Sequence, residues 1–153
     1  MGRLSDQSQS PILASLMNTP GVGQFTILVI DDDDLVCSMV QELLEVDGHL
    51  VFAASGGEEA LAIVGAVLPD LILVDRHMPG MNGLEVVQRL RADPTTSRVP
   101  IVAMTSASAH EANELTLAGC IAFIPKPFDP TEFRRLVAGI IAVTVSRTRR
   151  SDA

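Results

Sequence analysis

The sequence predicts an α/β fold built on a single doubly wound, five-stranded parallel sheet. Five short, continuous apolar runs alternate with stretches of helical periodicity. Runs of this kind are typical of parallel strands that are buried on both faces. Five strand–helix units with right-handed crossovers favour one open sheet with helices on both sides. A common strand order for such a sheet is 2-1-3-4-5.

The apolar runs define the expected strands, and the segments between them define the expected helices. Strands are expected at 26–31, 50–54, 70–75, 99–104 and 121–125. The first and last helices have an apolar stripe, in which hydrophobic residues recur every three or four positions. The stripes consist of Leu35, Val36, Met39, Val40, Leu43 and Leu44 in the first helix and of Phe133, Leu136, Val137, Ile140 and Ile141 in the last.

The helix boundaries are marked by capping signals. Ser55, Asn82, Ser108 and Asp129 are each followed three residues later by a glutamate, which is the spacing of a capping box. The helix after the aspartate run 31–34 lacks that box, and its own carboxylates occupy the positive end of the helix dipole. Gly48 and Gly119 fall where two helices are expected to end.

Composition limits the class of protein. The chain has 153 residues and a net charge of −8, which argues against the basic surface of a nucleic-acid-binding domain. Cys37 and Cys120 lie in apolar periodic segments and are interpreted as buried thiols in a reducing compartment. No apolar run approaches the ~18 residues of a membrane span, and the N-terminus lacks a signal peptide. A cytoplasmic protein is therefore expected.

The chain is expected to have three parts. Residues 1–24 are rich in Ser, Gln, Pro and Gly and are expected to form a flexible N-terminal extension. Residues 25–144 carry the regular pattern and form the domain. Residues 145–153 form a basic C-terminal tail that is too short for a separate output domain.

Charged residues follow three of the expected strands. Asp31 and Asp32 open a run of four aspartates after the first strand, Asp75 ends the third, and Lys126 follows the fifth. Strand order 2-1-3-4-5 brings the ends of strands 1 and 3 together at the point where ligands bind, with Thr105 and Lys126 at the rim. Clustered carboxylates raise one another's pKa unless a cation separates them, and Mg²⁺ prefers such oxygen ligands. This set of groups is suited to transferring a phosphoryl group.

From Thr26 to about Val143 the sequence resembles the receiver domain of the response-regulator family, the phosphoacceptor half of two-component signalling, which has a flavodoxin-like (βα)5 fold. Four motifs carry the resemblance, in order and at the expected separations. They are Val29-Ile30-Asp31-Asp32, the stretch Val74-Asp75-Arg76-His77-Met78-Pro79-Gly80-Met81-Asn82-Gly83, Met104-Thr105-Ser106-Ala107, and Lys126-Pro127-Phe128.

The resemblance implies a role for each residue of the site. Asp75 is the residue phosphorylated. Mg²⁺ (or Mn²⁺) is bound directly by Asp32 and Asp75, mostly through water by Asp31, and by the backbone carbonyl of His77. Further along the chain, Thr105 and Lys126 contact phosphoryl oxygens, Phe123 is a switch aromatic, and the Lys126–Pro127 bond is cis.

The resemblance also implies partners. The phosphodonor is a sensor histidine kinase or a histidine phosphotransfer protein, expected to dock on the first helix and the Pro127-Phe128 loop. Phosphorylation switches the face formed by the fourth and fifth strands and the helices that follow them, including Arg134 and Arg135, toward an unknown protein target. The chain is expected to be a signalling phosphoacceptor rather than an enzyme, a monomer or a phosphorylation-dependent dimer. Direct contact with nucleic acid or membrane is not expected, and the chain is either a stand-alone receiver or a piece of a longer regulator.

Other interpretations remain open. Asp31-x-Asp33 resembles the nucleophile motif of haloacid-dehalogenase-like phosphatases, with Asp31 as nucleophile, although that leaves Asp75 without a role. A pseudo-receiver that binds partners without phosphorylation is a third interpretation. Asp33 and Asp34 are interpreted as ordinary helix-start acids. Phe123 also fits a simple core position, and His49 and His110 are expected on the solvated surface.

Overall fold

The computed structural model describes residues 23–106 and 108–145, and it has the predicted doubly wound architecture. All strand pairs are parallel, in the order β2-β1-β3-β4-β5. The strands are β1 (Thr26–Ile30), β2 (Leu50–Ala54), β3 (Leu71–Asp75), β4 (Ile101–Thr105) and β5 (Ala122–Pro125). Most of the expected N-terminal extension, nearly all of the basic tail and Ala107 lie outside the described residues.

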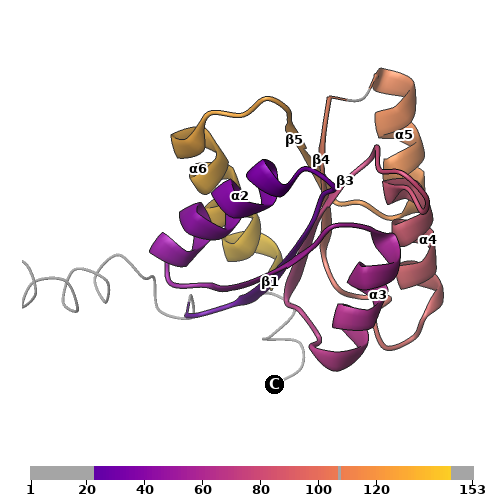
Figure 1. Cartoon of the computed structure of the whole chain (residues 1–153), viewed down its shortest axis with the longest axis horizontal. Coiled ribbons are helices and arrows are strands. Elements are labelled where there is room, and N and C mark those ends of the chain that lie inside the picture. The colour runs from indigo at the N-terminus through magenta and orange to yellow at the C-terminus, as the bar shows by residue number, and fades with distance from the viewer. Residues whose placement is uncertain (1–22, 107, 146–153) are drawn as a thin grey trace, which may run out of the picture.

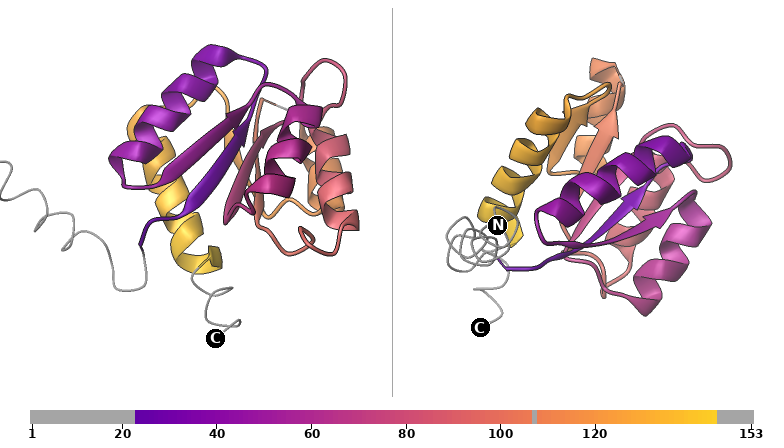
Figure 2. Two further views of the ribbon diagram at one scale, coloured as in Figure 1. Left: turned by 60° about the horizontal axis from the view of Figure 1, so that its bottom comes forward. Right: turned by 60° about the vertical axis from the view of Figure 1, so that its left-hand side comes forward.

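Helices cover both faces of the sheet (Figures 1 and 2). One face packs against α2 (Asp34–Val46) and α6 (Pro130–Ile140), which continues as a π-helical turn, η1 (Ile141–Val145). The other face packs against α3 (Gly57–Ala66), α4 (Gly83–Ala92) and α5 (Ala109–Ala118). The two sides form separate apolar clusters, so the sheet divides the core into two layers.

The apolar runs of the sequence are continuous because both faces of the central strands are buried. In β1, Ile27 and Val29 pack toward α2 and α6, while Leu28 and Ile30 pack toward α3 and α4. All four side chains are fully buried. Each such side chain contributes roughly 1.5–3 kcal/mol of apolar burial, so a polar residue on either side of this strand would be costly. The helices are anchored unequally, since α5 buries a single residue, Leu115.

Three of the four predicted helix starts are correct, and one is wrong. Capping boxes form at Asn82 and Ser108, and Asp129 accepts the backbone N–H of Glu132. At Ser55 the predicted box does not form, because the chain stays extended through Gly56 and α3 begins at Gly57. The Ser55 N–H donates instead to Glu59, one residue further along, at 2.6 Å.

Helix ends follow the predicted glycines. Gly48 follows the end of α2 with φ +92° and Gly119 caps α5 with φ +126°, a left-handed conformation that favours glycine. Gly119 also faces Arg91, whose guanidinium donates to the backbone carbonyls of Ser97, Val99 and Gly119. Arg91 therefore ties α4 to the turn before β5, a link that the sequence did not reveal.

The prediction that His49 lies on the solvated surface is wrong. Its side chain is half-buried at the start of β2, and its Nδ1 atom accepts the backbone N–H of Phe25 at 3.3 Å. The two rings are also in contact, with centroids 5.7 Å apart. His110, in contrast, is exposed as expected.

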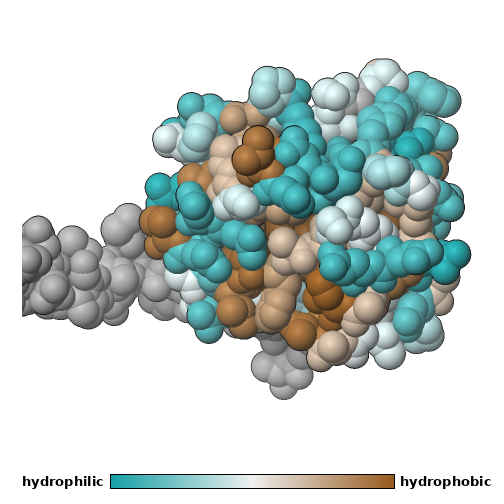
Figure 3. Space-filling model, in the orientation of Figure 1, coloured by the Kyte–Doolittle hydropathy of each residue, from teal (hydrophilic) through white to brown (hydrophobic). Residues whose placement is uncertain are grey.

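The surface is mainly polar, with isolated apolar residues. On the face shown in Figure 3, apolar residues gather mostly in the lower half, below a largely hydrophilic upper half. The most exposed large hydrophobic side chains are Leu35 at the start of α2, Leu117 near the end of α5 and Val46 at the end of α2. Across residues 23–106 and 108–145, no helix is both long enough and apolar enough to cross a membrane.

Candidate functional site

Three carboxylates meet where β1 and β3 end. The register pairs Ile30 with Val74, so the residues that follow, Asp31 and Asp75, lie at the same edge of the sheet. Ligand atoms of Asp31, Asp32 and Asp75 all lie within 4.8 Å of one another. Asp31 is fully buried and Asp75 is 7% exposed, whereas Asp32 faces solvent. The cluster therefore has a buried floor and one open side.

Asp31 is held by contacts on both carboxylate oxygens. Its Oδ1 accepts the backbone N–H of Asp33 at 2.9 Å, and its Oδ2 accepts a hydrogen bond from Lys126 Nζ at 2.6 Å. The Cys37 thiol donates to the Asp31 backbone carbonyl at 3.3 Å. Burial raises the pKa of that thiol to about 11, so Cys37 remains protonated and able to donate. Asp31 is therefore held through both carboxylate oxygens and its backbone carbonyl.

Asp75 is less tightly held. Its Oδ1 lies 3.4 Å from Lys126 Nζ, a longer contact than that between Lys126 and Asp31. Burial, followed by the negative charge of Asp31, raises the pKa of Asp75 above its ordinary value, and Lys126 opposes this shift. The Asp75 carboxylate is thus a poorly solvated anion that shares its one neighbouring ammonium group with Asp31, a state that an added cation would stabilise.

The end of β5 brings Lys126 into the cluster. Its backbone N–H donates to Thr105 O, and the Lys126–Pro127 peptide bond is cis, as the resemblance implied. Burial by itself would lower the pKa of Lys126, but the hydrogen bond and charge of Asp31, with those of Asp75, raise it above its usual value. The ammonium group is therefore fully charged at neutral pH.

Thr105 and Phe123 lie on the two neighbouring strands beside the cluster. Thr105 is the last residue of β4, is 7% exposed and pairs in register with Pro125, one residue before Lys126. Phe123 is half-buried and packs against the apolar cluster under α3, α4 and α5. This position is compatible both with a core residue and with an aromatic that changes rotamer, because part of the ring already reaches the surface.

The loop after Asp75 is joined to α5 by two contacts that the sequence analysis did not predict. His77 Nε2 lies 3.0 Å from Glu111, and the guanidinium of Arg76 lies 3.8 Å from Glu114. The Nε atom of Arg76 is buried without a hydrogen-bond partner. In the sequence, the only sign of these contacts is that Glu111 and Glu114 lie one helical turn apart. Their basic partners are more than 30 residues away, so the pairing could not be predicted.

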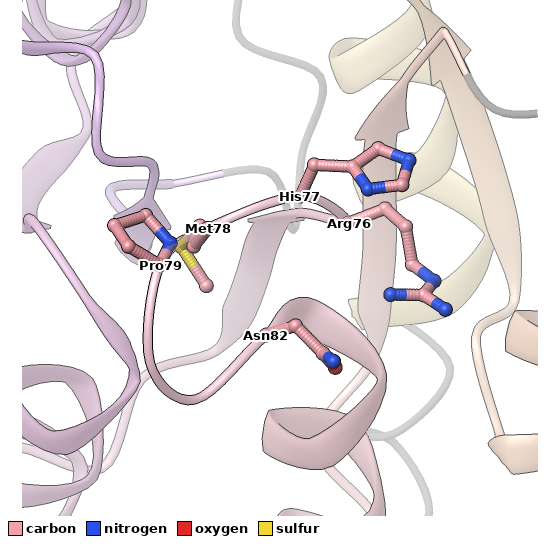
Figure 4. A pocket seen from close by; sticks show the side chains of 5 residues that line it. All are labelled: Arg76, His77, Met78, Pro79 and Asn82. Carbon is pink, nitrogen blue, oxygen red and sulfur yellow. The ribbon is translucent and has the colours of Figure 1, made fainter.

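The same loop borders a pocket of about 390 Å³. Figure 4 shows it between the loop and the start of α4, with the side chains of Arg76, His77, Met78, Pro79 and Asn82 around it. The loop is packed tightly on the helix, because an added Cβ on Gly83 would lie 2.2 Å from the backbone oxygen of Asp75. Only glycine at this position lets α4 begin so close to the phosphoacceptor candidate.

Arg134 and Arg135, the two arginines expected on the output face, make different contacts in α6. Arg134 forms hydrogen bonds to both carboxylate oxygens of Asp47, at the end of α2. It therefore joins α6 to α2 on the opposite side of the sheet from α5. Arg135 is exposed and pairs with Glu132 at 3.2 Å on its own helix, whereas the side chain of Arg134 stays 40% exposed beside Asp47.

The donor set fits a hard divalent cation. Three carboxylates within 4.8 Å supply only oxygen ligands, and their combined charge exceeds that of the single nearby lysine. Asp33 and Asp34 are placed outside this set: Asp33 caps α2 by accepting the Leu35 N–H, and Asp34 is in its first turn. This arrangement is unfavourable for the alternative with Asp31 as nucleophile, because both of its side-chain oxygens already accept hydrogen bonds in a fully buried position.

Comparison with known proteins agrees with this architecture. Residues 27–138 match the response regulator receiver domain family. The chain is 36% identical over 130 residues to the phosphate regulon transcriptional regulatory protein PhoB of Pseudomonas aeruginosa, covering 84% of this chain and 55% of PhoB. It is 38% identical to the DNA-binding response regulator MtrA of Mycobacterium leprae, over 82% of this chain and 52% of MtrA. The chain therefore spans about half the length of each of these two relatives.

Solved structures give the same result. The chemotaxis protein CheY4 of Vibrio cholerae superposes with a TM-score of 0.73 at 28% identity, over 77% of this chain and 99% of CheY4. The receiver domain of the sensor histidine kinase PA1611 of P. aeruginosa, solved with a magnesium ion coordinated in its active site cleft, has a TM-score of 0.70 at 26% identity, over 78% and 99% of the two chains. The strand order, the sequence match and these neighbours show that the chain belongs to the response regulator receiver domain family.

Proposed function

We propose that this domain accepts a phosphoryl group on Asp75 from a phosphohistidine donor. The observation that carries the proposal is the convergence of Asp31, Asp32 and Asp75 within 4.8 Å, beside the only lysine of the chain. Family membership supports a role in two-component signalling. In the transfer, a bond forms between an Asp75 carboxylate oxygen and phosphorus while the donor's P–N bond breaks and its electron pair returns to the imidazole.

The residues around Asp75 have separable roles in this step. Burial leaves the Asp75 carboxylate poorly solvated, which favours its reaction with an incoming electrophile. Lys126 stands 3.4 Å away, where its charge can stabilise phosphoryl oxygens, and it stays oriented by its shorter contact with Asp31. Thr105 supplies a hydroxyl at the end of the adjacent strand, proposed to bind another of these oxygens.

The proposed metal ligands are the carboxylates of Asp32 and Asp75, the backbone carbonyl of His77, and Asp31 acting mostly through water. When bound, Mg²⁺ (or Mn²⁺) would supply positive charge that offsets repulsion between a carboxylate and a phosphoryl group. The magnesium ion in the PA1611 receiver domain supports this choice of metal. Asp31 suits an indirect role, since its two oxygens are already engaged by Asp33 and Lys126.

We further propose that the chain acts as a signalling phosphoacceptor rather than as an enzyme, in the cytoplasm. Exposed Leu35 at the start of α2 and the half-buried Phe128 offer an apolar surface for a histidine kinase or phosphotransfer protein. Movement of Thr105 toward the phosphoryl group, with a change in the rotamer of Phe123, would alter the surface formed by β4, α5, β5 and α6. Arg135 and Leu117 are the exposed residues proposed for that output, toward a protein target or a second copy.

Phosphate incorporation from acetyl phosphate, followed by intact mass, tests the proposal. Wild type is expected to gain a metal-dependent adduct that Asp75→Asn lacks and Asp31→Asn reduces. An adduct that survives in Asp75→Asn and disappears in Asp31→Asn would favour the phosphatase-like alternative. No adduct in wild type, even with a donor kinase, would favour a pseudo-receiver.

A further inference from the structure

A single carboxylate, that of Glu111, contacts both loops that border the candidate site. One oxygen of Glu111 accepts the backbone N–H of Ser108 at 3.3 Å, completing the capping box at the start of α5. The other oxygen lies 3.0 Å from Nε2 of His77. Ser108 stands three residues after Thr105, and His77 stands two residues after Asp75. Glu111 thus bridges the loop that follows β4 and the loop that follows β3.

The bridge does not depend on the charge of the imidazole. Protonated histidine and the neutral tautomer that carries its hydrogen on Nε2 can both donate to a carboxylate, so the contact does not require a charged ring. The Glu111 carboxylate stays ionised, because the Ser108 N–H that it accepts, followed by His77, holds its pKa below the usual value. One turn further along α5, Glu114 faces Arg76 at 3.8 Å and reinforces the same alignment.

An equivalent glutamate in the same fold lacks this second contact. Glu85 occupies the same capping-box position at the start of α4, with its oxygen accepting the N–H of Asn82 at 3.2 Å. Among the described residues no ion pair joins Glu85 to another loop. Capping a helix therefore does not by itself require the contact that Glu111 makes with His77.

We propose that Glu111 is a positioning residue for the phosphoacceptor site. It acts through His77: by holding the imidazole, it fixes the backbone at residue 77 relative to Thr105 and so orients a carbonyl toward the metal position. The inference rests on the proposed function, since it assigns the His77 carbonyl to the metal. It explains why the acid of a helix cap faces the loop beside Asp75 instead of solvent.

A double-mutant cycle tests the proposal, with Glu111→Ala, His77→Ala, the double variant and Glu85→Ala as the matched capping control. Binding of Mn²⁺, measured by electron paramagnetic resonance, is expected to weaken about 10-fold in each single variant of the pair, the lower end of the range for groups that orient metal ligands. The double variant is expected to lose no more than the weaker-binding single variant, because both changes remove the same contact. Glu85→Ala is expected to bind Mn²⁺ like wild type.

Hydrogen exchange of the metal-free proteins gives a second readout. The backbone amides of residues 76–78 and 80 are expected to exchange faster in Glu111→Ala and His77→Ala but not in Glu85→Ala, which should affect α4 alone. Additive losses in the cycle, unchanged Mn²⁺ binding in Glu111→Ala, or equal effects in Glu85→Ala would overturn the proposal. Wild type that binds no Mn²⁺ would refute the proposed function, while exchange at residues 76–78 and 80 would still decide whether Glu111 holds the loop.

Discussion

The ammonium group of Lys126 lies closer to Asp31 than to Asp75, at 2.6 Å against 3.4 Å. Asp31 is fully buried, so this contact compensates a carboxylate that water cannot reach. Lys126 therefore has a structural role in addition to the one proposed in phosphoryl transfer. The two roles predict different consequences when the lysine is removed.

Lys126→Met is expected to destabilise the domain by about 3 kcal/mol at pH 7, because it leaves the buried Asp31 carboxylate without its counter-charge. Urea denaturation measures the change. Arg135→Met is the matched control, since it breaks an exposed pair with Glu132 that is worth at most ~1 kcal/mol. Equal effects of the two substitutions would contradict the structural role of Lys126.

Asp75→Asn is expected to stabilise the metal-free domain at pH 7. Because burial and Asp31 raise the pKa of Asp75 above 3.8, the stability that protonation provides is fully present below that value. This stability is lost as the pH rises through the raised pKa of Asp75 in the folded state. At neutral pH the ionised carboxylate therefore disfavours folding. Thermal unfolding should show a higher Tm for the variant at pH 7 and a gap that closes toward pH 3. A lower Tm at pH 7 would contradict this account.

Gly83→Ala is expected to destabilise the domain by ~3 kcal/mol or more and to impair phosphorylation, because the new Cβ meets the rigid backbone of Asp75 at 2.2 Å. Gly65→Ala provides the control on α3, where nothing lies within 4 Å of the added carbon. That change is expected to be neutral or to stabilise by up to ~1 kcal/mol through helix propensity. Chemical denaturation of both variants, with adduct formation by mass, checks the contrast.

His49 is expected to make the domain less stable in mild acid. Burial lowers the pKa of His49 in the folded state below 6.5, the ordinary value of an exposed histidine. The stability that neutral His49 provides is therefore present above about pH 6.5 and is lost as the pH falls through the lowered pKa. Protonation of Nδ1 would also remove the acceptor for the Phe25 N–H. His49→Gln should therefore flatten the fall in Tm between pH 7 and pH 5, whereas His110→Gln, at an exposed site, should not. A slope that His49→Gln leaves unchanged would refute the assignment.

Features coded by neighbouring residues were predictable from the sequence. The apolar runs identified β1 and β2 within a residue of their ends, because both faces of the central sheet are buried and polar residues mark where burial stops. The capping boxes at Asn82 and Ser108 were likewise found from spacing alone. The inferred strand order also predicted that Asp31, Asp32 and Asp75 lie close together, because it places the ends of the first and third strands side by side.

Features that depend on long-range contacts were not predictable. Ser55 has the spacing of a helix cap, but the chain stays extended through Gly56, and α3 begins at Gly57, which packs against Met81. The pairing of Arg134 with Asp47 was not predicted, because the two residues are 87 positions apart in the sequence. The same limit applied to the contact between Glu111 and His77, which depends on how α5 lies against the loop after β3.

The shallow anchoring of α5 has an energetic consequence. With only Leu115 fully buried, against four buried residues in α4, α5 exposes little apolar surface when it separates from the sheet. The free energy of such a local opening scales with the surface exposed, so α5 is expected to open well below the free energy of global unfolding. Among the α-helices of the described residues, α5 buries the fewest side chains, so it is the one that a charge change at Asp75 would displace with the least loss of apolar burial.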